Sequence, residues 1–209
     1  MFISFEGGEG TGKSTQIRRL AGFLERRGKS VVVLREPGGA PGAEAIRTLL
    51  LNGDPDRWDA IEELLLFSAA RHELVRTKIK PALEQGSWVL CDRYADSSAV
   101  YQGRAGGVPA EILQAVEDLA TGQLTPDLTF LLDLPVEVGL GRASSRIAGQ
   151  SDENSEARFE AKDKNFHESV RAAFLSRALT FSERFCVINA DRDESRVAAT
   201  IQSELEQRL

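Results

Sequence analysis

The stretch that decides the fold is GGEGTGKS, residues 7–14, which follows the apolar run FISF of residues 2–5. Apolar residues at helical spacing come directly after it, at Ile17, Leu20 and Leu24. The stretch fits G-x-x-x-x-G-K-[ST] in the strand-to-helix setting that a P-loop requires, and the composition of the chain gives only about 0.005 chance matches. Its glycines let backbone N–H groups approach a phosphate closely at a helix N-terminus. The sequence therefore predicts a nucleoside-triphosphate site.

The polar residues of this site have expected roles. Lys13 is expected to contact the β- and γ-phosphates, and the Ser14 hydroxyl is expected to ligate Mg²⁺. Asp92 follows the apolar run of residues 87–91, and a carboxylate at the end of a strand beside the P-loop can hold Mg²⁺ directly or through water. Arg93 comes next and can clamp a second phosphate. The loop residues predicted to bind the nucleotide are Gly7, Gly8, Glu9, Gly10, Thr11, Gly12, Lys13, Ser14 and Thr15.

Short apolar runs alternate with longer segments of helical periodicity along the rest of the chain. The runs predict buried strands at residues 2–5, 30–34, 87–91, 128–132 and 185–188. After the helix that follows the P-loop, helices are predicted from Pro41 and over residues 59–80, 109–120, 136–147, 159–180 and 194–209. Pro81 is expected to kink or restart the second of these. The alternation predicts an α/β fold with right-handed crossovers.

Composition narrows the class of protein. The 209 residues, 42% of them hydrophobic, predict one domain over residues 1–209. A net charge of −6 argues against a nucleic-acid partner. Two cysteines and two histidines lack zinc-ligand or disulfide spacing. No apolar run approaches the roughly 18 residues of a membrane span, and Glu6 stands where a secretory signal would stay apolar. We therefore expect no membrane partner and a cytoplasmic location.

A P-loop alone does not name a reaction. A GTPase switch would carry Asp-x-x-Gly after a strand and Asn/Thr-Lys-x-Asp at its base site, and neither pattern occurs in the sequence. The third predicted strand is followed instead by Asp92-Arg93-Tyr94.

At five places the sequence resembles the bacterial thymidylate kinase family. The matching stretches are residues 5–15, REPGG at 35–39, FSAAR at 67–71, DRY through YQG at 92–103, and PDLT with LD at 126–133. The resemblance implies a doubly wound, five-stranded parallel sheet with a mobile lid at about residues 142–160, and a homodimer. It also implies transfer of the γ-phosphoryl group of ATP to dTMP with Mg²⁺, giving dTDP and ADP on the way to dTTP. Another nucleoside monophosphate kinase, or a P-loop switch that transfers no phosphate, is the alternative.

The resemblance assigns the acceptor site residue by residue. Phe67 corresponds to the aromatic ring that stacks on thymine, and Arg71 to the arginine that donates to a base carbonyl. Their spacing of four puts them on one helix face. Ser98 and Gln102 match base contacts, and Tyr101 matches the tyrosine under the sugar, where a ribose hydroxyl would collide.

Four charged residues complete the expected acceptor site. Arg47 and Arg93 match the clamps on the acceptor phosphate, and Glu9 resembles the P-loop acid that contacts the sugar hydroxyl. Glu36 is interpreted either as a magnesium or substrate-side carboxylate or as a loop ion pair.

The residue at position 10 indicates which arginines neutralise the charge on the transferred phosphoryl group. One branch of the family has an arginine at this position, whereas the branch that this chain resembles uses lid arginines. Arg146 and Arg158 flank the polar stretch at 148–157 and are predicted to be catalytic, with Arg146 favoured because Ala157 replaces the family's usual aspartate before Arg158. Arg142 is predicted to pack against adenine. The loop at 104–107, RAGG, also departs from the family pattern.

Overall fold

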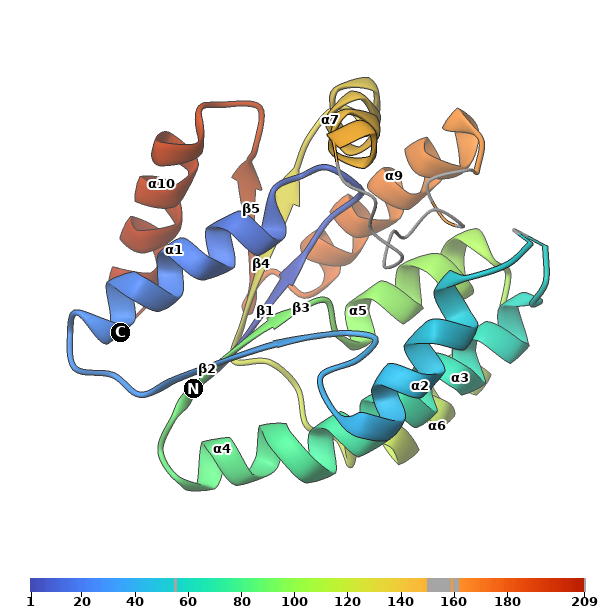
Figure 1. Ribbon diagram of the computed structural model, residues 1–209, viewed down its shortest axis with the longest axis horizontal. Helices are drawn as coiled ribbons and strands as arrows, with labels where there is room; N and C mark the ends of the chain where they lie inside the picture. Colours follow the sequence, from blue (N-terminus) through green and yellow to red (C-terminus); the bar gives the residue numbers. More distant parts are fainter. Residues whose placement is uncertain (55, 150–158, 160–161, 209) are drawn as a thin grey trace.

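The computed structural model describes residues 1–54, 56–149, 159 and 162–208 (Figure 1). Its centre is a sheet of five parallel strands in the order β2-β3-β1-β4-β5, so the predicted fold class is confirmed. The strands are β1 (Phe2–Glu6), β2 (Val31–Arg35), β3 (Trp88–Asp92), β4 (Leu128–Asp133) and β5 (Phe185–Asn189).

All five strands end one residue beyond the predicted end, and each added residue is polar or charged: Glu6, Arg35, Asp92, Asp133 and Asn189. An apolar run stops at the first polar side chain, but the hydrogen-bonded ladder continues past it. These polar groups therefore lie at the carboxyl edge of the sheet, where open α/β sheets bind ligands.

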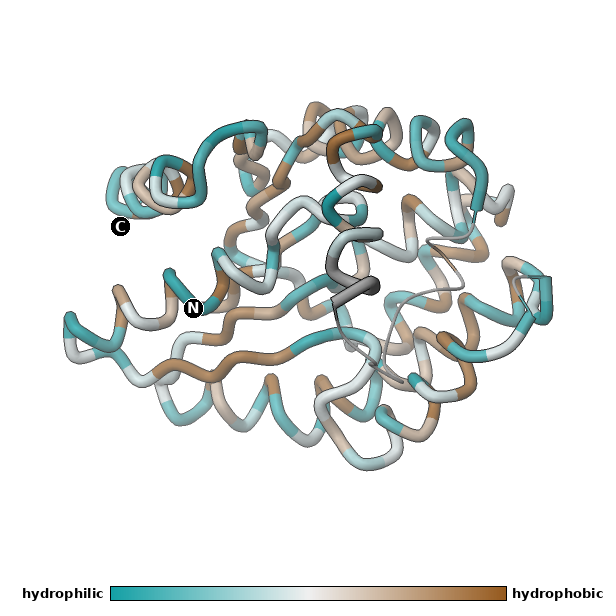
Figure 2. Tube along the Cα trace, turned by 45° about the horizontal axis from the view of Figure 1, so that its top comes forward, coloured by the Kyte–Doolittle hydropathy of each residue, from teal (hydrophilic) through white to brown (hydrophobic). Residues whose placement is uncertain are grey.

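Helices cover both faces of the sheet (Figure 1). On one face α1 (Lys13–Glu25) and α10 (Glu194–Glu206) pack against each other and the strands, in a cluster that includes Ile17, Leu20 and Ile201. The other face packs against the helices between β2 and β3 and against α9 (Lys164–Thr180). Figure 2 shows hydrophobic residues concentrated along the strands in the interior, as expected for parallel strands with both faces covered.

Between β2 and β3 the chain forms α2 (Pro41–Leu51), α3 (Ala60–Leu74), a π-helical segment (Val75–Ile79) and α4 (Lys80–Glu84). Asp59 and Glu62 form a capping box at the start of α3. Pro81, expected to kink or restart the long helix, lies in the first turn of α4, directly after the π-helical turns that end at Ile79. Proline has no N–H to donate to the preceding turn, so the α-helical ladder breaks at this point.

After β3 the chain forms α5 (Ala95–Ser98) and a second π-helical segment (Ala99–Ala105), neither of which the sequence predicted. Then come α6 (Ala110–Thr121) and α7 (Val136–Gly149). The helix predicted over residues 159–180 is not continuous: Phe159 is helical, but residues 162 and 163 are not, and α9 begins at Lys164, where the side chain of Asp163 accepts from Phe166 N. Within the described ranges, no helix is both long and apolar enough to cross a membrane.

Candidate active site

The P-loop connects β1 to α1 in a conformation that only glycine adopts easily. Gly7, Gly10 and Gly12 have φ angles of 138°, 66° and 89°, in the region disfavoured for side chains. Lys13 Nζ donates to the carbonyl oxygens of Gly7 and Gly8, at 3.1 and 3.0 Å. The lysine thus lies along the loop, where a bound polyphosphate would meet its charge.

Gly10 lies directly against Gly139 of α7. A Cβ at Gly10 would lie 2.0 Å from the carbonyl oxygen of Gly139, and a Cβ at Gly139 would lie 2.5 Å from that of Glu9. This contact leaves no room for a side chain at position 10 unless α7 moves. The absence of an arginine there therefore has a steric basis in this chain.

Ser14 and Asp92 come from different elements and meet beside the P-loop. Ser14 Oγ donates to Asp92 Oδ2 at 2.8 Å. Mg²⁺ binds hard oxygen ligands, usually one or two protein oxygens with water and phosphate oxygens. A hydroxyl and a carboxylate at the mouth of a phosphate loop fit that requirement.

Arg93 links the P-loop to a pocket at the carboxyl ends of β2 and β3. Its Nη2 donates to Glu9 Oε1 at 2.8 Å and its Nη1 to Gly7 O at 3.0 Å. Glu9 Oε1 also accepts from the hydroxyl of Tyr101, at 3.1 Å. The backbone of Arg93 is left-handed, with φ of 67°, which is strained for a residue with a side chain. Such strain is typical of functional sites.

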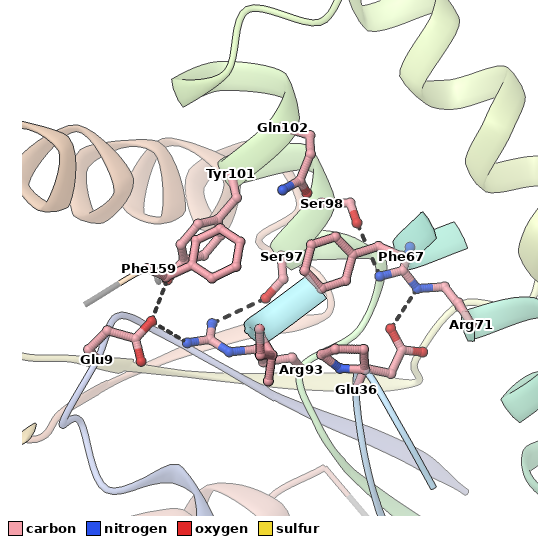
Figure 3. Close-up of a pocket in the computed structure, with 12 residues that line it drawn as sticks. Glu9, Glu36, Phe67, Arg71, Arg93, Ser97, Ser98, Tyr101, Gln102 and Phe159 are labelled. Carbon is pink, nitrogen blue, oxygen red and sulfur yellow. Dashed lines mark hydrogen bonds and ion pairs between the residues drawn. The ribbon is translucent and has the colours of Figure 1, made fainter. Parts of the chain in front are cut away.

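The pocket is apolar at its centre and polar at its edges (Figure 3). Phe67 faces it from α3, and Tyr101 and Phe159 meet edge to face with ring centroids 5.9 Å apart. The lining residues are Glu9, Glu36, Pro37, Leu51, Phe67, Arg71, Arg93, Ser97, Ser98, Tyr101, Gln102 and Phe159. The predicted acceptor-site residues are brought together here, except Arg47, which does not line the pocket and whose Nη1 donates to Pro37 O at 2.8 Å.

Arg71 is held among three acceptors and is 1% exposed. Its Nε donates to Glu36 Oε2 at 2.7 Å, its Nη1 to Glu117 Oε1 at 2.6 Å, and its Nη2 to Ser98 Oγ at 3.1 Å. Burial raises the pKa of Glu36 to about 8. The positive charge of Arg71 acts to lower this pKa, and the nearby carboxyl group of Glu117 acts to raise it. Glu36 is thus a buried hydrogen-bond partner of Arg71 that also lines the pocket.

Only part of the predicted lid is described. Arg142 projects from α7, and its Nη1 lies 3.4 Å from the carbonyl oxygen of Ala190, just after β5. Arg146 belongs to α7, whereas Arg158 and most of the stretch at 148–157 lie outside the described residues. Phe159, also in the predicted lid, packs into the pocket.

Several polar residues of the site, some of them fully buried, were missed by the sequence reasoning. Glu6 accepts from Tyr94 N and Ser97 Oγ, at 2.8 and 2.6 Å, and so shapes the turn after β3. Burial, with a contribution from Asp96, raises the pKa of Glu6 to about 7. The sequence feature that could have identified Glu6 is its position at the end of an apolar run, directly before the P-loop. The other missed residues are Glu63, Ser97, Asp96, Glu117 and the Asp133–Arg171 ion pair.

Comparisons with known proteins agree with this geometry. The family model described as thymidylate kinase matches residues 5–201. A thymidylate kinase of Caulobacter vibrioides is 51% identical over 208 residues, covering 100% of this chain and 97% of that protein. One from Nitrobacter winogradskyi is 52% identical, covering 99% of this chain and 88% of that protein. The crystal structure of thymidylate kinase from Ehrlichia chaffeensis superimposes with a TM-score of 0.78 at 30% identity, covering 98% of both chains.

Proposed function

Because the chain belongs to the thymidylate kinase family, we propose that it transfers the γ-phosphoryl group of ATP to dTMP between the P-loop and the pocket of Phe67 and Arg71. The products are dTDP and ADP. The observation that carries this proposal is the position of Arg93, whose guanidinium contacts the P-loop at Gly7 and Glu9 while lining the pocket. The whole reaction lies within one kinase domain, residues 1–209.

Transfer between two phosphates depends on positioning and charge rather than on a strong base, since the acceptor is already an anion. Lys13 neutralises charge on the β- and γ-phosphates. Arg93 holds the acceptor phosphate from the pocket lining, and Arg47, which donates to Pro37 O at the edge of the pocket, is proposed as the second clamp. Both offset the repulsion between the two anions. When bound, Mg²⁺, held through Ser14 and Asp92, supplies charge neutralisation and orientation of the donor phosphates.

The pocket recognises the thymine base and the deoxyribose by separate contacts. Phe67 stacks on the base, and the Nη groups of Arg71 donate toward the carbonyl at position 4, where cytosine carries an amino group. Ser98 and Gln102 contact the base edge. Tyr101 lies under the sugar, and Glu9 accepts from the sugar hydroxyl.

The lid supplies charge that the P-loop lacks. Gly10 is packed against Gly139, so an arginine that assists Lys13 at the transferred phosphoryl group must come from another segment. Arg146 is the first candidate and Arg158 the second. Arg142, on the same helix near Ala190, contacts adenine. Closure would also exclude water from the transferred group.

We further propose that the protein is a cytoplasmic homodimer without a nucleic-acid partner. Large apolar side chains remain exposed on neighbouring helices α3 and α6: Ile61 and Leu65 on α3, and Ile112 and Leu119 on α6. Their spacings of four and seven put each pair on one helix face. A second copy that covers this surface would remove it from water.

The experiment is a coupled ADP-release assay with ATP and a panel of nucleoside monophosphates. The proposal expects kcat/KM for dTMP to exceed that for dCMP, CMP, AMP and GMP by orders of magnitude. Comparable values for a second acceptor would favour a broader nucleoside monophosphate kinase. No dTMP-dependent ADP release would refute the proposal.

A further inference from the structure

Gln102 lies between the pocket and a buried carboxylate. The residue is 2% exposed and lines the pocket from the π-helical segment Ala99–Ala105. Its Nε2 donates to Glu63 Oε2 of α3 at 2.8 Å. Glu63 does not line the pocket, so it reaches a bound base through Gln102 and not by direct contact.

The chemistry of this hydrogen bond fixes which way the amide points. A side-chain amide has one accepting oxygen and one donating nitrogen, and the two can exchange places by rotation. A carboxylate offers only acceptors, so Glu63 binds the nitrogen end and disfavours the flipped amide. No described residue donates to Gln102 Oε1, which remains for a ligand.

The orientation matters because thymine and cytosine differ at N3. Thymine carries a proton there and donates, whereas neutral cytosine carries a lone pair and accepts. An amide oxygen that faces N3 stabilises the first base and repels the second. The flipped amide would reverse that preference.

We propose that Glu63 is a positioning residue for base selectivity, which holds the Gln102 amide with its oxygen toward N3 of the bound pyrimidine. The inference rests on the proposed function of the pocket. It is distinct from the role of Arg71, which reads position 4 of the base. Glu63, Phe67 and Arg71 are spaced by four along α3, so one helix face carries all three.

The test is Glu63→Gln, which keeps the shape of the side chain and gives it both a donor and an acceptor. Gln102 can then bind in either orientation. The readout is the ratio of kcat/KM for dTMP to that for dCMP, measured on one preparation so that the active fraction cancels. The ratio is expected to fall at least about tenfold, equivalent to about 1.4 kcal/mol, the scale of one hydrogen bond.

Glu62→Gln is the matched control, because it makes the same change one residue earlier. Glu62 is exposed and accepts from Asp59 N, away from the pocket. The dTMP/dCMP ratio of Glu62→Gln is expected to equal that of the wild type.

Glu63→Asp is the second variant. It shortens the side chain, but the carboxylate still only accepts hydrogen bonds. This variant should keep the preference for dTMP even if the rate falls.

Equal losses for both substrates in Glu63→Gln would overturn the proposal, since a purely structural link between α3 and the π-helical segment predicts that result. Loss of selectivity in Glu63→Asp as large as in Glu63→Gln would also overturn it. A wild-type protein that phosphorylates neither pyrimidine would instead contradict the proposed function.

Discussion

Arg93 Nη2 lies 2.8 Å from Glu9 Oε1, and both side chains are buried. This ion pair joins the turn after β3 to the centre of the P-loop. It gives the two parts of the site a fixed relative position, on which transfer between two bound phosphates depends. The left-handed backbone of Arg93 turns the chain there, and its N–H donates to Phe5 O at 2.9 Å.

Arg71→Ala is expected to destabilise the fold as well as impair base recognition. The change leaves the carboxyl groups of Glu36 and Glu117 without their buried partner, and breaking such a pair costs about 3–5 kcal/mol. Urea unfolding measures the loss in the free energy of unfolding.

Adding Glu117→Gln to Arg71→Ala should recover part of this loss, because one buried charge is removed. Arg76→Ala, on the exposed side of the next turns, is the control, and equal stability of Arg71→Ala and Arg76→Ala would contradict the ion-pair assignment.

Tyr101 should control discrimination between deoxyribose and ribose acceptors. Tyr101→Phe removes only the hydroxyl that donates to Glu9, whereas Tyr101→Ala opens space under the sugar. We expect the alanine variant to narrow the kcat/KM gap between dUMP and UMP much more than the phenylalanine variant does. If neither substitution changes that gap, another residue selects the sugar.

Stability should fall as pH rises through the pKa of Glu36. Its carboxyl has a pKa of about 8 in the folded protein against 4.5 for an ordinary glutamate, so the folded state retains a proton that the unfolded state releases. Stabilisation from this group is therefore full below about pH 4.5 and is lost through pH 8, with a slope of at most about 1.4 kcal/mol per pH unit.

Glu36→Gln isolates this effect, because glutamine cannot ionise. Glu6, whose pKa is raised to about 7, also makes stability fall as pH rises. It is present in both proteins, so the difference between their stability curves reports Glu36. The free energy of unfolding of the wild type should fall more steeply than that of the variant between pH 5 and 8. Parallel curves would show that Glu36 is ionised throughout this range.

Arg146→Ala is expected to lower kcat by at least about two orders of magnitude, since arginines that stabilise a transferring phosphoryl group contribute about 10³–10⁵. Binding of dTMP, measured by calorimetry, should change little. Arg158→Ala is the comparison. A loss below tenfold for Arg146→Ala with a severe loss for Arg158→Ala would reverse the two roles, and near-normal rates in both would reject the lid arginines.

The strands and the P-loop were predictable because their signals are local. Apolar runs and glycine spacing lie within a few residues of sequence, and each strand ends one residue beyond its predicted end, with β2 and β3 also beginning one residue later. The second π-helical segment carried no such signal, although it positions Tyr101 and Gln102. The partners of Arg71 could not be derived, because Glu36 and Glu117 lie 35 and 46 residues away along the chain. Pairing over such separations depends on the packed fold, not on local pattern.

Calorimetric titration of dTMP into Phe67→Ala tests the central claim most directly, namely that acceptor and donor occupy separate sites joined by Arg93. Lys13→Ala is titrated alongside, because it changes the phosphate loop without touching the pocket. The account predicts that Phe67→Ala loses most of its dTMP affinity, whereas Lys13→Ala binds dTMP like the wild type but no longer transfers phosphate. Wild-type dTMP affinity in Phe67→Ala would contradict the account.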